Sequence, residues 1–130
     1  MKRLLIDTNI YSHALRGNQT VIKTLQKAEV IGISSISIGE LFSGFKGGNR
    51  EQKNREELDI FLDSSRVQLF YIDEITANYY ADILNNLKAS GKPIPTNDIW
   101  IAASAFQHGL KLYSMDAHFK SVKGLMLLES

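Results

Sequence analysis

The sequence predicts a single α/β domain, a three-layer α/β/α sandwich around a central, mainly parallel sheet of about five strands. Three observations predict it. Short runs of consecutive apolar residues are typical of strands buried on both faces. These runs alternate with longer segments of helical periodicity. The chain has 130 residues and no internal repeat or low-complexity segment, so residues 1–130 are expected to form one domain.

The start of the chain predicts a strand, two helices and a second strand. Residues 2–7 contain the apolar run "LLI" and predict a buried strand. Helical spacing begins at Thr8 and stops at the Gly-Asn pair of residues 17–18. A second amphipathic helix follows, and its apolar side consists of Val21, Leu25 and Ala28. The run "VIGIS" at residues 30–34 predicts the second buried strand.

The middle of the chain predicts three helices and a strand. The segment "SISIGELFSGF" at residues 35–45 has helical spacing and is closed by two glycines. Residues 49–65 predict a polar helix with a narrow apolar stripe. The run "VQLFYI" at residues 67–72 predicts the third strand, and a long helix is expected from about residue 74 to residue 89.

The last part of the chain begins with the clearest loop, "SGKPIPTN" at residues 90–97. An almost wholly apolar helix, "DIWIAASAFQHG", is expected at residues 98–109. The runs "LKLYS" at 110–114 and "LMLLE" at 125–129 predict two more strands, with a short turn between them. The alternation of strand and helix favours a parallel sheet throughout.

Four acids lie where such a sheet binds ligands, beyond the carboxyl ends of its strands. Asp7 ends the first strand, and Asp116 follows the fourth. Asp98 opens the apolar helix, and Glu40 lies in the helix after the second strand. If the strand order brings these segments together, four carboxylates converge on one edge of the sheet.

Each acid also has a purely structural interpretation. Asp7 could cap the helix that follows it. Glu40 has the spacing of a capping box with Ser37. Asp98 would be stabilised by the helix dipole in the first turn after a capping Thr96.

Asp116, likewise, could simply open a surface turn. Caps and turns do not explain why acids border the strongly apolar segments "LLID", "DIWIAA" and "LYSMD". Clustered carboxylates repel one another unless a cation neutralises them, and oxygen ligands suit Mg²⁺ or Mn²⁺. The sequence therefore predicts an oxygen-ligated divalent metal site.

The composition excludes other classes of site. The chain has no cysteine, which excludes disulfides, thiolate-held zinc and cysteine nucleophiles. The net charge of +1 gives no strong basic excess of the kind that indicates nucleic-acid binding by itself. The first apolar run breaks at Asp7, which argues against a secretory signal. No stretch approaches the roughly 20 apolar residues of a membrane span. A cytoplasmic protein without a membrane partner is expected.

The acids lie within motifs that resemble the PIN-domain ribonucleases, in particular the VapC-type toxins of bacterial and archaeal toxin–antitoxin pairs. The motifs are "IDTN" at residues 6–9, the lone glutamate of "SIGELFSG" at 37–44, "TNDIWIAASAFQHG" at 96–109 and "YSMDAHF" at 113–119. The resemblance implies a PIN-like fold and a metal-dependent endoribonuclease that hydrolyses RNA phosphodiester bonds as the toxin of a type II pair.

The resemblance also implies roles for single residues around one or two Mg²⁺ or Mn²⁺ ions. Asp7 and Asp98 would be the direct ligands, and Asp116 a ligand or the support of one. Glu40 would bind metal through water or orient the nucleophile. Small polar groups that support the site would be Asn9 and Ser114, which replaces a common threonine and keeps its hydroxyl. His118 belongs to the last motif, with no role that the residues indicate.

Partners follow from the same resemblance: an RNA substrate, a cognate antitoxin and a second copy in a homodimer. Basic residues near an acidic pocket would contact the RNA backbone, although each of them also suits an ordinary solvated surface. The candidates are Arg16, Lys46, Arg50, Lys53, Arg55, Lys88 and Lys92.

Two alternatives stay open. One is a stand-alone PIN nuclease in RNA maturation, which a neighbouring antitoxin gene would argue against. The other is a catalytically silent PIN-fold interaction module, whose usual mark is the loss of one or two acids, and here all four are present. A flavodoxin-like or receiver-type domain is set aside, because no glycine-rich phosphate-binding signature follows the first strand.

Overall fold

A four-stranded parallel sheet forms the centre of the molecule. The computed structural model describes residues 2–128. The strand order is β3-β2-β1-β4, and every neighbouring pair is parallel. The strands are β1 (Lys2–Ile6), β2 (Ala28–Ser34), β3 (Val67–Phe70) and β4 (Lys111–Tyr113). The predicted parallel α/β sheet is confirmed, although β3 and β4 are shorter than the runs 67–72 and 110–114.

The predicted fifth strand at residues 125–129 is reduced to an isolated parallel bridge between Leu112 and Leu127. The Leu112 amide donates to the Met126 carbonyl at 2.8 Å, and the Leu128 amide donates to the Leu112 carbonyl at 2.9 Å. Because β4 has only three residues, the segment beside it forms this single bridge instead of a longer ladder. Glu129, the last residue of the predicted strand, lies outside the described residues.

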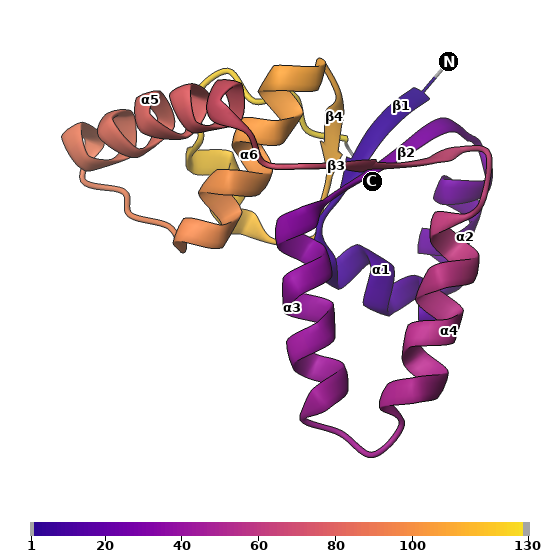
Figure 1. Cartoon of the computed structure of the whole chain (residues 1–130). Helices are drawn as coiled ribbons and strands as arrows, with labels where there is room; N and C mark the ends of the chain where they lie inside the picture. The colour runs from indigo at the N-terminus through magenta and orange to yellow at the C-terminus, as the bar shows by residue number, and fades with distance from the viewer. Residues whose placement is uncertain (1, 129–130) are drawn as a thin grey trace.

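Helices cover both faces of the sheet, as the sandwich prediction requires (Figure 1). One face packs against α1 (Thr8–Leu15), α2 (Gln19–Gln26), α3 (Ser35–Lys46) and α4 (Glu51–Leu62). The other packs against α5 (Glu74–Ser90), α6 (Thr96–His108) and the short 3₁₀ helix η1 (Ala117–Ser121). Figure 1 shows α3 and α4 as an antiparallel hairpin that projects beyond the sheet.

The two cores explain why the strands are continuous apolar runs. Leu4 and Ile6 belong to the core under α1–α4, whereas Leu5 between them belongs to the core under α5 and α6. All three side chains are fully buried. Because successive side chains of a strand point to opposite faces, a strand covered on both faces needs an apolar residue at every position.

The prediction that Ala28 belongs to the second helix is wrong. Helix α2 ends at Gln26, and Ala28 begins β2, where it pairs with Lys2. Arg66 stabilises the turn between them, because its guanidinium donates to the Leu25 carbonyl at 2.9 Å and to the Ala28 carbonyl at 2.7 Å. The spacing of 21, 25 and 28 fits a helix, but strand pairing with β1 decides the conformation of Ala28.

The strand order reverses direction at β1, which has β2 on one side and β4 on the other. Parallel sheets bind ligands beyond the carboxyl ends of their strands at such a reversal. Ile6 at the end of β1 is in register with Tyr113 at the end of β4. The residues that follow these two strands therefore emerge side by side.

Candidate active site

Asp7 is the most buried of the four predicted acids, with 4% of its surface exposed. It follows β1 directly and caps α1, because its Oδ1 accepts a hydrogen bond from the Ile10 amide at 2.9 Å. Its Oδ2 accepts a second bond from the Ser114 hydroxyl at 2.5 Å. Asp7 therefore does cap α1, but it uses only Oδ1 for this, and Oδ2 binds Ser114.

Ser114 connects Asp7 to Asp116. Its Oγ donates to Asp7 and accepts a hydrogen bond from the Asp116 amide at 2.9 Å. Asp116 in turn caps η1, since its Oδ1 accepts from the His118 amide at 2.9 Å. The turn after β4 is thereby held against the end of β1.

Glu40 is positioned by residues of two other helices. Its Oε1 accepts a hydrogen bond from the Thr8 hydroxyl at 2.6 Å, and its Oε2 accepts from the Asn97 side-chain amide at 3.4 Å. The predicted capping box between Ser37 and Glu40 is wrong, because the N-cap of α3 is Ser34, three residues before Ser37. Glu40 therefore lies in the second turn of α3, where its carboxylate is not needed to cap the helix.

Asp98 lies in the first turn of α6, whose N-cap is Pro95 and not the predicted Thr96. Its Oδ2 is 3.4 Å from the His118 Nδ1, which is also 3.1 Å from the Asp116 Oδ1. One ligand atom from each of these three residues lies within 4.8 Å of the other two. Asp7 and Glu40 lie outside this tightest group.

Two of the four acids, Asp7 and Asp98, have raised pKa values. Burial raises the pKa of the Asp7 carboxyl, and the charges of Asp116 and Glu40 raise it further, against hydrogen bonds from Ser114 and Ile10 that lower it. Burial likewise raises the pKa of Asp98, where Asp116 and Glu40 add to the rise and His118 opposes it. Carboxyl groups whose pKa is raised by burial and by neighbouring negative charges form a site that a cation would stabilise.

Two grooves border the acids. One of about 590 Å³ lies beside Glu40 and Asn97, and its remaining lining residues are Ser35, Ile36, Gly39 and Ser43. The other, of about 250 Å³, borders Ser114 and Asp116, with Met115, Ala117, Lys120, Leu127 and Leu128 along its walls. Both are open and partly polar, which suits an extended polar ligand better than a small apolar one.

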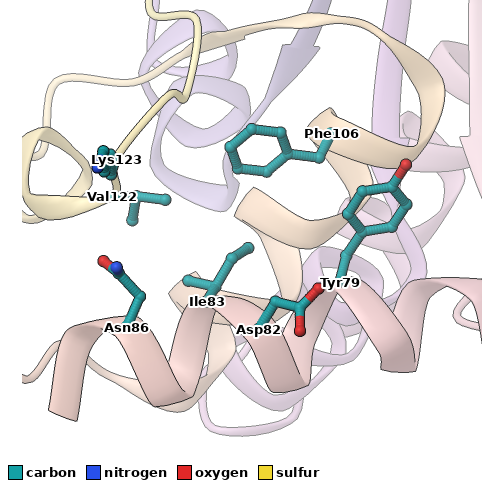
Figure 2. Close-up of a pocket in the computed structure, with 7 residues that line it drawn as sticks. All are labelled: Tyr79, Asp82, Ile83, Asn86, Phe106, Val122 and Lys123. Carbon is teal, nitrogen blue, oxygen red and sulfur yellow. The ribbon is translucent and has the colours of Figure 1, made fainter. Parts of the chain in front are cut away.

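A more apolar cavity of about 310 Å³ lies elsewhere, between α5, α6 and the segment after η1 (Figure 2). In Figure 2 the side chains of Ile83 on α5 and Phe106 on α6 face each other across it. The other lining residues are Tyr79, Asp82, Asn86, Val122 and Lys123. None of the four acids lines this cavity, so it is separate from the candidate site.

The sequence analysis assigned no role to three motif residues that contact the acids: Thr8, Asn97 and His118. Each is adjacent to a predicted acid or two residues from one, and this proximity is the signal that could have identified them. Asn9, which was predicted to support the site, is exposed on α1 and has no side-chain hydrogen bond within residues 2–128.

Four of the predicted RNA-binding residues, Lys46, Arg50, Lys53 and Arg55, lie on the α3–α4 hairpin. Lys46 and Arg55 are within 3.2 Å and 3.6 Å of the Glu51 carboxylate, and Arg55 also lies 3.9 Å above the Phe42 ring. The other three are exposed: Arg16 at the end of α1, and Lys88 and Lys92 near the end of α5.

Within residues 2–128, no helix has the length and apolar character needed to cross a membrane.

Known proteins are similar to this chain in sequence and in fold. The model of the PIN domain family matches residues 4–125. The ribonuclease VapC2 of Rickettsia felis is 30% identical over 128 residues, which are 95% of this chain and 94% of the relative. The toxin FitB of Neisseria gonorrhoeae is 33% identical over 123 residues, which are 87% of each chain.

A crystal structure of VapBC2 from Rickettsia felis bound to a promoter DNA fragment contains a chain that superposes with a TM-score of 0.86 at 29% identity. The superposition covers 96% of both chains. The matches to the family model and to the Rickettsia relative extend over nearly the whole chain, and residues 4–125 of the family match span the positions of all four acids. The chain therefore belongs to the PIN-domain family and, within it, to the VapC group.

Proposed function

We propose that this protein is a metal-dependent endoribonuclease and the toxin of a type II toxin–antitoxin pair. The observation that carries the proposal is the convergence of Asp7, Glu40, Asp98 and Asp116 from four different parts of the chain. The charges of Asp116 and Glu40 raise the pKa of both Asp7 and Asp98. The names of the relatives, ribonucleases and toxins, support the same activity. RNA as substrate implies the cytoplasm as the site of action.

The residues present fit a hard divalent cation. The donors are carboxylate oxygens, which Mg²⁺ and Mn²⁺ prefer. Burial and like charges raise the pKa values of Asp7 and Asp98, and a cation would offset both effects. When bound, such an ion would stabilise negative charge on a phosphodiester and make a water molecule a better nucleophile.

The chain's own residues would divide the remaining work. Asp7 and Asp98 would hold the ion, and Asp116 would hold it or support Asp98. Ser114 would orient Asp7 through its hydrogen bond of 2.5 Å. Thr8 and Asn97 would hold Glu40 at a fixed orientation, so that Glu40 can orient the attacking water.

We also propose that the protein pairs with a cognate antitoxin and forms a homodimer. Support for the antitoxin comes from similar solved structures, which include VapBC2 from Rickettsia felis bound to a promoter DNA fragment and FitAB bound to a DNA fragment. The homodimer rests on the family resemblance. The basic residues of the α3–α4 hairpin are candidates for contacts with RNA phosphates. Such contacts would contribute affinity and little sequence preference.

Cleavage of a mixed RNA pool, with Mg²⁺ or Mn²⁺ and with a chelator, tests the proposal. We expect metal-dependent cleavage by the wild type and none by Asp7→Asn or Asp98→Asn, each checked for folding by circular dichroism. Asp82→Asn is the matched control, because this exposed acid lines the cavity of Figure 2 and is expected to leave cleavage unchanged. Full cleavage by both acid variants would refute the assignment of the site.

A further inference from the structure

We infer that His118 is a further ligand of the divalent ion, through Nδ1, and that it gives the site a preference for Mn²⁺ over Mg²⁺. The inference rests on the proposed metal site and goes beyond its four acids. His118 lies between two of those acids, with its Nδ1 3.1 Å from Asp116 Oδ1 and 3.4 Å from Asp98 Oδ2.

The distances fit neighbouring positions around one ion. Two adjacent ligands of an octahedral ion with bonds of about 2.1 Å lie about 3.0 Å apart, and opposite ligands lie about 4.2 Å apart. The nitrogen-to-oxygen distances of 3.1 Å and 3.4 Å are close to the first value. All three ligand atoms lie within 4.8 Å of one another. A single ion can therefore contact the three groups with little rearrangement.

The backbone holds the imidazole in this place. Asp116 Oδ1 accepts a hydrogen bond from the His118 amide at 2.9 Å, which fixes the turn on one side. The next residue, Phe119, is only 1% exposed and anchors the turn in the core on the other side. The ring itself is 51% exposed and makes no Nε2 hydrogen bond within residues 2–128, so water can solvate that nitrogen.

The chemistry of the donor predicts the metal preference. Mg²⁺ prefers oxygen ligands and keeps several waters, so an imidazole adds little to its affinity. First-row transition metals accept imidazole nitrogen readily. A site of carboxylates alone would bind Mg²⁺ and Mn²⁺ by similar contacts, whereas one nitrogen ligand would favour Mn²⁺.

The competing arrangement is a hydrogen bond only, in which His118 Nδ1–H orients the two carboxylates and never contacts the ion. Pulsed EPR of the Mn²⁺-loaded protein distinguishes the two arrangements, because a ligating nitrogen couples magnetically to the ion. We expect a ¹⁴N coupling in the wild type that changes to ¹⁵N when the protein is made with ¹⁵N-histidine. This isotopic comparison requires no substitution and cannot be affected by misfolding.

Substitutions then assign the coupling to one residue. His118→Ala is expected to lose it and to bind Mn²⁺ more weakly on the order of tenfold or more, with a smaller change for Mg²⁺ in isothermal titration calorimetry. His13→Gln, on α1, is the matched histidine control and should keep both properties.

The possible failures are distinguishable. Mn²⁺ bound to the wild type without nitrogen coupling would overturn the role of His118 and leave the acidic site and the proposed function intact. A wild type that binds neither ion would contradict the proposed function as well. A coupling that persists in His118→Ala would assign the ligand to another histidine and refute this inference.

Discussion

The Ser114 hydroxyl donates to the Asp7 carboxylate at 2.5 Å, across a separation of 107 residues in the sequence. The two residues meet because β1 and β4 are parallel neighbours whose last residues, Ile6 and Tyr113, are in register. The same hydroxyl accepts from the Asp116 amide, so one small side chain positions two of the four acids.

Ser114→Ala removes the donor that orients Asp7. Loss of such a supporting hydrogen bond typically weakens metal affinity by about 10–100-fold. We expect a loss in that range in calorimetric titration with Mn²⁺ and a parallel fall in RNA cleavage. Ser114→Thr keeps the hydroxyl and should retain most of both. Equal affinities for wild type and Ser114→Ala would show that Asp7 needs no such support.

Thr8→Val is a nearly isosteric change that removes the hydroxyl donating to Glu40 at 2.6 Å. Glu40 would then keep only the weaker contact with Asn97 at 3.4 Å. We expect kcat for RNA cleavage to fall by roughly tenfold while KM changes little, because a positioning defect raises the barrier by about 1.4 kcal/mol without affecting phosphate contacts. Thr8→Ser is the control that retains the hydrogen bond. A fall confined to KM would contradict the orienting role of Glu40.

Gly32 lies in β2 where the strand passes under the ring of Phe70. A Cβ at this position would lie 2.7 Å from Phe70 Cε2 and 3.0 Å from Leu110 Cδ1. We therefore expect Gly32→Ala to lower the free energy of unfolding by about 1–3 kcal/mol, the usual effect of overpacking. Urea denaturation at fixed pH measures the change.

Two further variants test the cause of that loss. Gly44 lies in α3, where an added Cβ would meet no atom within 4 Å. Gly44→Ala should therefore raise the free energy of unfolding by about 0.5–1 kcal/mol. Adding Phe70→Leu to Gly32→Ala should cost less than the sum of the two single changes. Simple additivity would place the strain somewhere other than the contact with Phe70.

His108 introduces a pH dependence of stability. Burial lowers the pKa of its ring below the ordinary value of 6.5, against the charge of Asp73, which raises it. The ring stacks on Phe70 with centroids 3.9 Å apart, and its Nε2 is buried without a hydrogen-bond partner in residues 2–128. The unfolded chain therefore takes up this proton at a higher pH than the folded chain does.

The sign follows from that difference. The free energy of unfolding falls as the pH drops from about 6.5 towards the lower folded-state pKa, and it rises again as the pH returns. We expect urea denaturation between about pH 5 and 7.5 to show a shallower dependence for His108→Phe, which keeps the stacking, than for the wild type. His13→Gln serves as the histidine control. Parallel curves for wild type and His108→Phe would exclude His108 as the titrating group.

The sequence by itself determined the layers of the fold. Leu4, Leu5 and Ile6 are consecutive apolar residues, and only a strand covered on both faces buries all three. It also determined that Asp7 and Asp116 lie at one edge, because parallel strands end on the same side of a sheet. Both conclusions depend on the composition and spacing of short segments, which can be read from the sequence alone.

The tertiary structure decided what surrounds the acids. Thr8 meets Glu40 at a separation of 32 residues, and His118 meets Asp98 at a separation of 20. It also decided that Ala28 pairs in a strand and that Leu127 makes only a bridge. Local patterns record the preferences of single segments, whereas these contacts depend on strand order and register. Those are set by the packing of the whole chain, and no short stretch of sequence contains them.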